Sequence, residues 1–415
     1  MFDAARKVMA AGIYPYFRPI DSDQGASVMM NGRETLMLGS NNYLGLTNHP
    51  RVKKAAQAAV DQYGTGCAGS RFLNGTLGVH IECEERLAEF IGKEAVLVFS
   101  TGYQANVGAI ATFGDRHQTL VTDELAHASI FDSARMSFAK MVKFAHNDMA
   151  SLEQKLIAMG DKPKIVISEG VFSMEGDTVR LPEMVKLCEK YNADLILDDA
   201  HGVGVYGDRG EGTAGHFGLT DKVDLIVGTF SKSLASIGGF VGASEDVIHY
   251  MKHNSRALMF SASPPPASVA AVIEALKIIK EEPERRELLW RNTDYLRKGL
   301  HDLGLSTELS DTPIIPVLVG DMITAFTMCH MLQEEGVFIN PVVPPAVQPH
   351  QCLIRFSVMS THTLEQIDIA LERMARVIKK VNLSAEVLHQ ADNHPSDQST
   401  RSEGISSIPL DGSGN

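Results

Sequence analysis

The chain has few of the features that mark secreted, zinc-binding or membrane-spanning proteins. Its 415 residues include only five cysteines, an odd number, and no two of them form a C-x-x-C pair. A disulfide framework and a metal site are therefore not expected, and a reducing, cytoplasmic setting fits best. No apolar run approaches the roughly 18 residues that a membrane span needs. The first residues also lack the basic and apolar regions of a secretory signal.

An excess of basic residues is also absent. The formal net charge is −13, so general binding to nucleic acid is not expected. What remains is an ordinary globular composition, 44% hydrophobic and 21% charged. The length fits one large domain with a smaller one.

Short apolar runs alternate with helical periodicity through the middle of the chain. The runs that we predict to be buried parallel strands are Ala95–Phe99, Thr119–Val121, Ile165–Ser168, Asp194–Leu197 and Leu225–Gly228. Helices are predicted over 51–63, 80–91, 149–159 and 181–191. This alternation is typical of βαβ units, so the predicted fold is α/β with a mainly parallel sheet, and its ligands should bind beyond the carboxyl ends of the strands.

The pattern changes towards the end of the chain, after a Pro-rich stretch. We expect an N-terminal segment (1–48), a large domain (49–284), a smaller α+β domain (285–383) and a disordered polar tail (384–415). The smaller domain should contain strands at 314–318 and 353–357 and a closing helix at 364–381.

One candidate for covalent chemistry is Lys232, in the stretch Thr229-Phe-Ser231-Lys232-Ser233 directly after a predicted strand. A lysine at a strand end beside a cleft can reach a carbonyl carbon and be partly neutral. The hydroxyls of Thr229 and Ser231 can hydrogen-bond a phosphate. The same five residues also fit an ordinary solvated loop.

A second candidate is Asp198-Asp-Ala-His201, after the strand Asp194–Leu197. A buried carboxylate needs a cationic partner. A protonated pyridine nitrogen is such a partner, and His201 can then hydrogen-bond the ring hydroxyl. A metal site or a helix N-cap would use an aspartate here equally well.

Two further segments follow predicted strands. The stretch Ser100–Asn106, which contains Gly102 and Tyr103, leads onto a helix whose N-terminus can bind a phosphate. His127, in the segment after Thr119–Val121, can stack on a flat ring. A histidine satisfied by hydrogen bonds within the fold is the alternative.

Arg355 lies in the apolar stretch Leu353–Ser357 of the smaller domain. Burial of an arginine is unfavourable unless an anion accompanies it. A substrate carboxylate bound by two hydrogen bonds would satisfy it, as would an internal salt bridge.

In this order, Asp198-Asp-Ala-His201 followed by Gly228-Thr-Phe-Ser-Lys232 resembles the α-oxoamine synthases, which are fold-type I enzymes dependent on pyridoxal 5′-phosphate (PLP). The resemblance covers about residues 1–383. Supporting stretches are Tyr16–Ile20, Gly39–Gly45, Tyr63–Thr76, Gly170–Gly176 and Met259–Ser263. Within the family, the loop Gly69–Thr76 resembles the bacterial serine palmitoyltransferase branch.

The resemblance implies roles for these residues at the cofactor. Lys232 would be the Schiff-base lysine and Asp198 the partner of the pyridine nitrogen, while His201 and Ser173 would bond the ring hydroxyl. His127 would stack on the ring, and together with Lys232, Asp198 and His201 it would make up the catalytic set. The residues implied at the phosphate are Gly102, Tyr103, Thr229 and Ser231, joined by Ser261 and Ala262 acting on the cofactor of a partner subunit.

The implied reaction joins L-serine to a long-chain acyl-CoA, palmitoyl-CoA, with loss of CO2 and CoA, in a homodimer with its active site at the interface. Arg355 would bind the substrate carboxylate, and Asn41, or its neighbour Asn42, would lie near the substrate. Because the product is a lipid precursor, peripheral contact with the inner membrane is open.

Three alternatives are kept. A sister synthase would use glycine or alanine with another acyl-CoA through the same core chemistry. A catalytically silent subunit would not need the amine of Lys232. A nicotinamide dehydrogenase would need a G-x-G-x-x-G motif after the first strand, and no such motif opens a helix at that place in the sequence.

Overall fold

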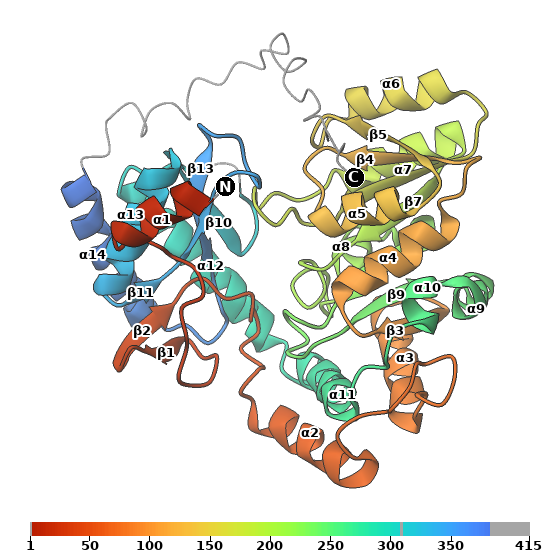
Figure 1. Ribbon diagram of the computed structural model, residues 1–415, viewed down its shortest axis with the longest axis horizontal. Coiled ribbons are helices and arrows are strands. Elements are labelled where there is room, and N and C mark those ends of the chain that lie inside the picture. The colour runs from red at the N-terminus through yellow and green to blue at the C-terminus, as the bar shows by residue number, and fades with distance from the viewer. Residues whose placement is uncertain (1, 308–309, 382–415) are drawn as a thin grey trace, which may run out of the picture.

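The computed structural model describes residues 2–307 and 310–381, so the tail predicted for 384–415 lies outside the described residues. Figure 1 shows two lobes, with the helices α11 (Pro266–Glu281) and α12 (Glu284–Asp302) running between them. No helix of the described part is long and apolar enough to cross a bilayer.

The larger lobe is built on a seven-stranded sheet with the order β3-β9-β8-β7-β6-β4-β5. β9 alone runs antiparallel to its neighbours, which confirms a mainly parallel α/β fold. The strands are β3 (Ala95–Phe99), β4 (Thr119–Asp123), β5 (Lys140–Phe144), β6 (Lys164–Glu169), β7 (Asp194–Asp198), β8 (Leu225–Thr229) and β9 (Gly239–Ala243).

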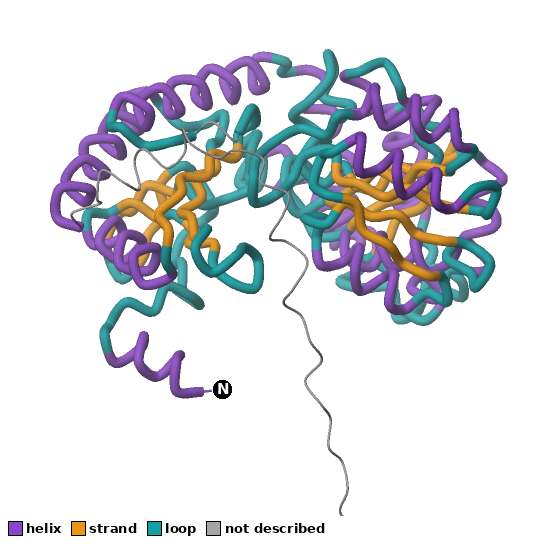
Figure 2. Tube along the Cα trace, turned by 90° about the horizontal axis from the view of Figure 1, so that it is seen from above, coloured by secondary structure: helices purple, strands orange, loops and turns teal. Residues whose placement is uncertain are grey.

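Helices cover both faces of this sheet, as the tube in Figure 2 shows. Alternate side chains of one strand enter different cores: Ile165 and Ile167 belong to one cluster and Val166 to the other. Both faces are therefore buried, which is why these strands appear in the sequence as unbroken apolar runs. The main covering helices are α3 (Gly78–Ile91), α4 (Gly102–Phe113), α5 (Ala128–Met136), α6 (Met149–Met159), α7 (Leu181–Tyr191) and α9 (Glu245–Asn254).

The smaller lobe contains an antiparallel sheet, β10-β13-β12, and a second small sheet, β1-β2-β11. In the second sheet the N-terminal strand β2 pairs in parallel with β11, so the start of the chain joins its C-terminal part. The elements are β1 (Ser27–Met30), β2 (Arg33–Met37), β10 (Ile314–Gly320), β11 (Val337–Phe338), β12 (Asn340–Val342), β13 (Cys352–Ser357), α13 (Met322–Glu334) and α14 (Leu364–Val381).

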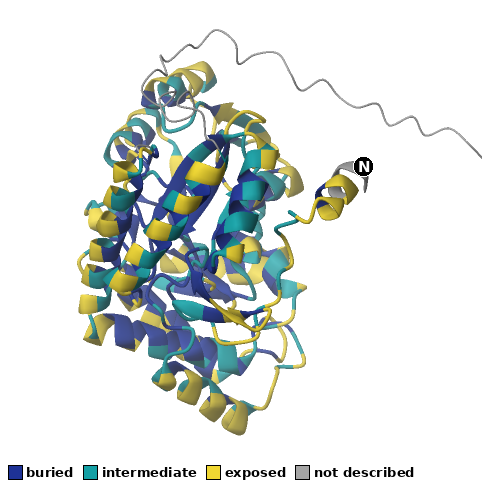
Figure 3. Ribbon diagram, turned by 90° about the vertical axis from the view of Figure 1, so that its left-hand side faces the viewer, coloured by how far each residue is buried: buried dark blue, intermediate teal, exposed yellow. Residues whose placement is uncertain are grey.

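The remaining helices lie around these two lobes. Figure 3 shows that the N-terminal helix α1 stands away from the rest of the described chain. They are α1 (Phe2–Ala10), α2 (Pro50–Tyr63), α8 (Thr213–His216), α10 (Arg256–Met259) and a 3₁₀ turn at Thr220–Lys222.

Two strands of the large sheet were not predicted. β5 reads Lys-Met-Val-Lys-Phe and lies at the sheet edge, where its lysines are exposed, so it has no continuous apolar run. β9 contains Gly239 and Gly242, which lower strand propensity. A Cβ on Gly239 would lie 2.6 Å from the Cα of Gly102, so the close approach of α4 requires glycine there.

Candidate active site

The carboxyl ends of the parallel strands open into a cavity of about 450 Å³, which Arg355 enters from β13 of the smaller lobe. The structure brings together all of the predicted site residues except Ser261 and Ala262. Those that line the cavity are Asn41, Gly102, Tyr103, His127, Ser173, Asp198, His201, Thr229, Ser231, Lys232 and Arg355.

Lys232 lies three residues after the end of β8 and lines the cavity. Burial lowers the pKa of its ammonium to about 8, while the nearby carboxylates of Asp198 and Glu169 act in the opposite direction. The lowered pKa increases the neutral share of this amine near neutral pH, and the neutral form is the one that acts as a nucleophile or proton acceptor.

Asp198 ends β7 and its side chain faces the cavity with 5% of the residue exposed. Its Oδ2 accepts a hydrogen bond from Asn106 Nδ2 at 2.6 Å and its Oδ1 accepts from the Ala200 N–H at 3.0 Å. Both donors are neutral, so the carboxylate can still receive a cation. The adjacent Asp199 is occupied by the N–H and hydroxyl of Thr213, each at 2.6 Å.

A metal at Asp198 has no support, because residues 2–307 and 310–381 contain no group of three or more His, Cys, Asp or Glu side chains that could hold one.

His201 is buried at the cavity wall, and its Nδ1 lies 2.7 Å from the hydroxyl of Tyr43. Burial first, and then the charges of Lys232 and Arg355, hold its pKa well below the usual range. The ring is neutral and can exchange one hydrogen bond with a ligand oxygen.

His127 is the N-cap of α5, where its Nδ1 accepts from the Ser129 N–H at 3.2 Å. Burial lowers its pKa, and the nearby Lys232 acts in the same direction. One ring nitrogen of His127 is therefore hydrogen-bonded within the fold, as the alternative proposed. The side chain still lines the cavity.

The N-terminus of α4 and the turn after β8 form a candidate phosphate site. Gly102 and Tyr103 are the first helical residues after the N-cap Thr101, so their N–H groups have no acceptor inside the helix. The hydroxyls of Thr229 and Ser231 lie 2.9 Å apart beside them. A Cβ on Gly102 would lie 2.7 Å from Thr229 Oγ1, so only glycine allows this approach.

Arg355 is 6% exposed and donates to three neutral acceptors. Its Nε donates to the Ser173 carbonyl at 2.7 Å, its Nη1 to Ser357 Oγ at 2.9 Å and its Nη2 to Asn41 Oδ1 at 3.1 Å. Within the described chain no carboxylate forms a salt bridge with it. The internal salt bridge considered above is therefore absent, and the cavity offers a buried cation to an anionic ligand.

The structure also separates two neighbouring asparagines. Asn41 lines the cavity, whereas the Asn42 amide donates to the Gln24 carbonyl at 2.9 Å and to Thr47 Oγ1 at 2.8 Å. Asn42 therefore serves the fold and Asn41 is the residue available to a ligand.

Ser261 and Ala262 do not line this cavity. Ser261 Oγ accepts from Gln104 Nε2 at 2.9 Å, and the Ala262 carbonyl accepts from the Ser100 hydroxyl. Their role towards a partner subunit stays a prediction.

Glu169 was missed in the sequence because the strand was expected to end at Ser168. It ends β6 directly opposite Asp198 in register, it is 3% exposed, and its Oε1 has no hydrogen-bond partner. Burial first, and then the Asp198 charge, raise its pKa well above the usual range, so the site favours the protonated form of this group. Asn106, the donor to Asp198, was also given no role.

These features fit PLP. The cavity offers a partly neutral lysine, a buried carboxylate with neutral donors, a phosphate site at a helix N-terminus and an arginine without a counter-ion. Each satisfies one group of the cofactor or of an amino-acid substrate bound to it.

Comparison with known proteins agrees with this chemistry. The family model of aminotransferase class I and II matches residues 33–374. Serine palmitoyltransferase of Sphingobacterium spiritivorum is 52% identical over 385 residues, covering 92% of this chain and 96% of that protein. An 8-amino-7-oxononanoate synthase of Thermoanaerobacter pseudethanolicus is 42% identical over 375 residues, covering 90% and 95%.

A serine palmitoyltransferase solved with its PLP internal aldimine has a TM-score of 0.89 at 34% identity, covering 92% of this chain and 98% of that one. These matches extend over nearly all of the described residues, and the motifs that carry the resemblance line one cavity. The chain therefore belongs to the aminotransferase class I and II family, and within its fold-type I members to the α-oxoamine synthases.

Proposed function

We propose that this enzyme condenses L-serine with palmitoyl-CoA, giving 3-ketodihydrosphingosine, CoA and CO2. The observation that carries the proposal is the pairing, in one cavity, of a lysine with a lowered pKa and a buried arginine that has no carboxylate partner among residues 2–307 and 310–381. An amino acid bound there would present its carboxylate to Arg355 and its Cα to Lys232.

PLP, when bound, supplies an electron sink for the negative charge that develops at Cα. Lys232 takes the Cα proton, and Asp198 holds a proton on the ring nitrogen so that the sink is effective. The bond from Cα to the thioester carbonyl then forms while the C–S bond breaks and CoA leaves. After CO2 departs, Lys232 returns a proton to Cα.

Other residues orient the groups that react. Arg355 and Asn41 would hold the substrate carboxylate, His201 and Ser173 would hydrogen-bond the ring hydroxyl of the cofactor, and His127 would contact its ring. In the phosphate site Gly102 and Tyr103 donate N–H groups, and Thr229 and Ser231 donate hydroxyls.

The second candidate is a sister synthase that takes glycine or alanine with another thioester. The observation behind it is the 42% identity to an 8-amino-7-oxononanoate synthase. It ranks second because the identity to a serine palmitoyltransferase is higher, at 52%. A catalytically silent subunit is disfavoured because Lys232 lines the cavity together with its expected partners.

The deciding experiment has two parts. Absorbance titrations of the PLP-loaded enzyme with serine, glycine and alanine identify the amino acid, and thiol release across acyl-CoA chain lengths identifies the acyl donor. We expect serine and a C16 thioester to be preferred. Turnover with glycine or alanine and a short or dicarboxylic thioester would instead establish the sister reaction.

Replacement of Lys232 by alanine should abolish turnover, since no other amine in the cavity can replace it. Borohydride reduction of the wild-type enzyme followed by peptide mapping should find a pyridoxyl group on Lys232. An unmodified Lys232 peptide, or an active Lys232→Ala enzyme, would refute the assignment.

We also propose a homodimer, with Ser261 and Ala262 completing the site of the partner, and a division into segments at 1–48, 49–284 and 285–383. Exposed Leu73, Phe260 and Phe138 supply apolar surface for association, at 75%, 73% and 87% exposure.

Peripheral membrane contact is proposed from the lipid product, and co-sedimentation with anionic vesicles tests it.

A further inference from the structure

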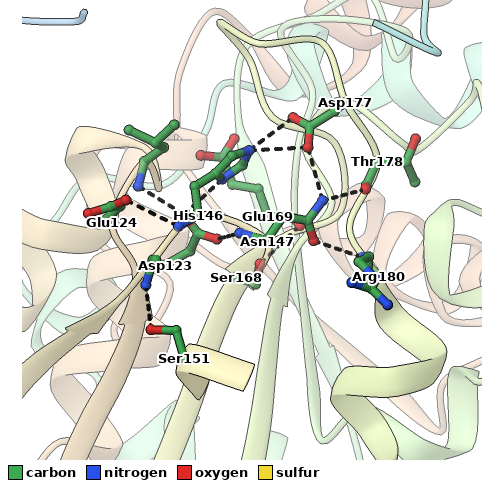
Figure 4. Close-up of polar contacts among 12 residues, drawn as sticks. Asp123, Glu124, His146, Asn147, Ser151, Ser168, Glu169, Asp177, Thr178 and Arg180 are labelled. Carbon is green, nitrogen blue, oxygen red and sulfur yellow. Dashed lines mark hydrogen bonds and ion pairs between the residues drawn. The ribbon is translucent and has the colours of Figure 1, made fainter. Parts of the chain in front are cut away.

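Asp123, His146 and Asp177 form a charged cluster, drawn in Figure 4, and none of the three lines the cavity. His146 follows β5, and its Nδ1 lies 3.1 Å from Oδ1 of Asp123, the last residue of β4. Its Nε2 lies 3.1 Å from Oδ2 of Asp177, in the turn after β6. The side chain of Asp123 is fully buried and that of His146 is 19% exposed.

Both ring nitrogens of His146 face a carboxylate, so both must donate and the ring must be protonated. Burial opposes the charge, but the hydrogen bonds with Asp123 and Asp177 raise the pKa of His146 to about 10. Other acidic groups also face it: Glu124 accepts from its backbone N–H at 3.2 Å, and the Glu175 carboxyl lies nearby. The imidazolium is therefore the state that holds the cluster together at neutral pH.

The cluster anchors the turn at residues 170–178 to the ends of β4 and β5. Asp177 also accepts from Asn147 Nδ2 at 2.9 Å, and the same amide donates to the Thr178 carbonyl at 2.9 Å. The ring of Phe172 packs edge-on against His146, with 4.4 Å between centroids. Two hydrogen bonds, one charged contact and one ring contact thus hold this turn from one side.

On its other side the turn meets the smaller lobe. The Ser173 carbonyl accepts from Arg355 Nε at 2.7 Å, and Thr178 Oγ1 donates to Asp311 Oδ1 at 2.9 Å. The Asp311 N–H donates to the Gly176 carbonyl at 3.3 Å. The hydrogen bond from Arg355 Nε to the Ser173 carbonyl orients the guanidinium group of this arginine, which is the proposed substrate-binding residue.

We propose that His146, held between Asp123 and Asp177, is a positioning residue: it fixes the 170–178 turn and, through the Ser173 carbonyl, orients Arg355 towards the substrate carboxylate. The inference rests on the proposed function, because it concerns an amino-acid substrate at that site. Loss of His146 should therefore weaken the binding of ligands that carry a carboxylate more than the binding of those that lack one. The phosphate site at the start of α4 lies on another element and should not change.

The test uses PLP-loaded wild type, His146→Gln and the control His117→Gln, an exposed histidine remote from the turn in sequence. Absorbance titrations give dissociation constants for L-serine and for ethanolamine, which is serine without its carboxylate. For His146→Gln we expect serine binding roughly tenfold weaker, as for a misplaced binding group. The titrations are made at saturating PLP, because Ser173 of the same turn is proposed to contact the cofactor. Ethanolamine binding by His146→Gln, and both affinities of His117→Gln, should match wild type within about twofold.

A double variant separates positioning from general loosening. On an Arg355→Gln background, His146→Gln should produce no further loss of serine affinity, because the group through which it acts is gone. Equal weakening of serine and ethanolamine, additive losses in the double variant, or unchanged serine affinity would each overturn the inference.

If His146→Gln fails to fold or to load PLP, the same titrations are made with Asp177→Asn. It keeps the His146–Asp123 pair, removes the charge that ties the turn, and should reproduce the serine-selective loss. A wild-type enzyme that loads PLP but binds no amino acid would refute the proposed function itself, and with it this inference.

Discussion

At the residue scale, the cavity combines two carboxyl groups with different surroundings at the ends of adjacent strands. Glu169 and Asp198 face each other in register at the ends of β6 and β7. Asp198 receives hydrogen bonds from Asn106 and Ala200, whereas Glu169 Oε1 receives none. Burial raises the pKa of Glu169 well above its usual range, so of these two groups the hydrogen-bonded Asp198 is the one placed to accept a cation.

Replacement of Glu169 by glutamine should therefore be tolerated, with kcat/KM within about threefold of wild type, because a neutral group replaces a neutral group. Asp198→Asn is the matched comparison and should lower kcat/KM by roughly 100-fold or more, through loss of the charge that holds the ring proton. Steady-state kinetics decide. A drop of similar size in both variants would show that Glu169 acts as an anion.

His146 should make stability depend on pH in the alkaline range. Its pKa in the folded protein, about 10, lies above its ordinary value of 6.5. Its contribution to stability is therefore complete below pH ~6.5 and is lost as the pH rises through ~10. The difference in unfolding free energy between wild type and His146→Gln should be about 3 kcal/mol near pH 6 and shrink towards pH 10. Denaturant melts at both values measure it, and a difference independent of pH would contradict the protonated state.

At the element scale, the phosphate site depends on how closely the start of α4 approaches β8 and β9. Two glycines permit the contact: a Cβ on Gly102 would meet Thr229, and one on Gly239 would meet the backbone of Gly102. Neither glycine needs an unusual backbone conformation, so space alone accounts for them.

Gly102→Ala should weaken PLP binding by about tenfold, because relief of the 2.7 Å contact with Thr229 Oγ1 moves the N–H donors away from the phosphate. Gly78→Ala is a matched control, as Gly78 is also the first residue of a helix and a Cβ there meets only the Tyr63 hydroxyl at 3.7 Å. Fluorescence titration of the apo forms gives both constants. Unchanged affinity in Gly102→Ala would remove α4 from the phosphate site.

At the scale of the whole molecule, the cavity is assembled from both lobes. Arg355 comes from the smaller lobe, and the turn that orients it comes from the larger one. The segment at Ser261 and Ala262 lies outside the cavity of its own chain, as a segment serving a second subunit would.

Subunit mixing should reveal such sharing. Lys232→Ala and Ala262→Asp chains are each expected to be inactive as homodimers, the second because its carboxylate would repel the partner's cofactor phosphate. Mixed dimers have one intact site, so random exchange should restore about a quarter of wild-type activity. Activity after exchange is the measurement, with unmixed homodimers as controls. No recovery in verified heterodimers would mean that the segment serves its own chain, and an active Ala262→Asp homodimer would mean that it serves no site.

The sequence by itself determined five of the seven strands of the large sheet and most of the cavity lining. Strands buried on both faces appear as apolar runs, and motifs placed directly after them meet at one sheet edge, which brought Lys232, Asp198 and His127 together. β5 was missed because its exposed lysines at the sheet edge interrupt the apolar run, and β9 was missed because its glycines, which allow close contact with neighbouring residues, have low strand propensity. Only the tertiary structure decided the rest, because long-range contacts control burial and partners. Ser173 and Arg355 are 182 residues apart in the chain. That contact, the burial of Glu169 and the choice of Asn41 over Asn42 depend on neighbours that no local pattern specifies.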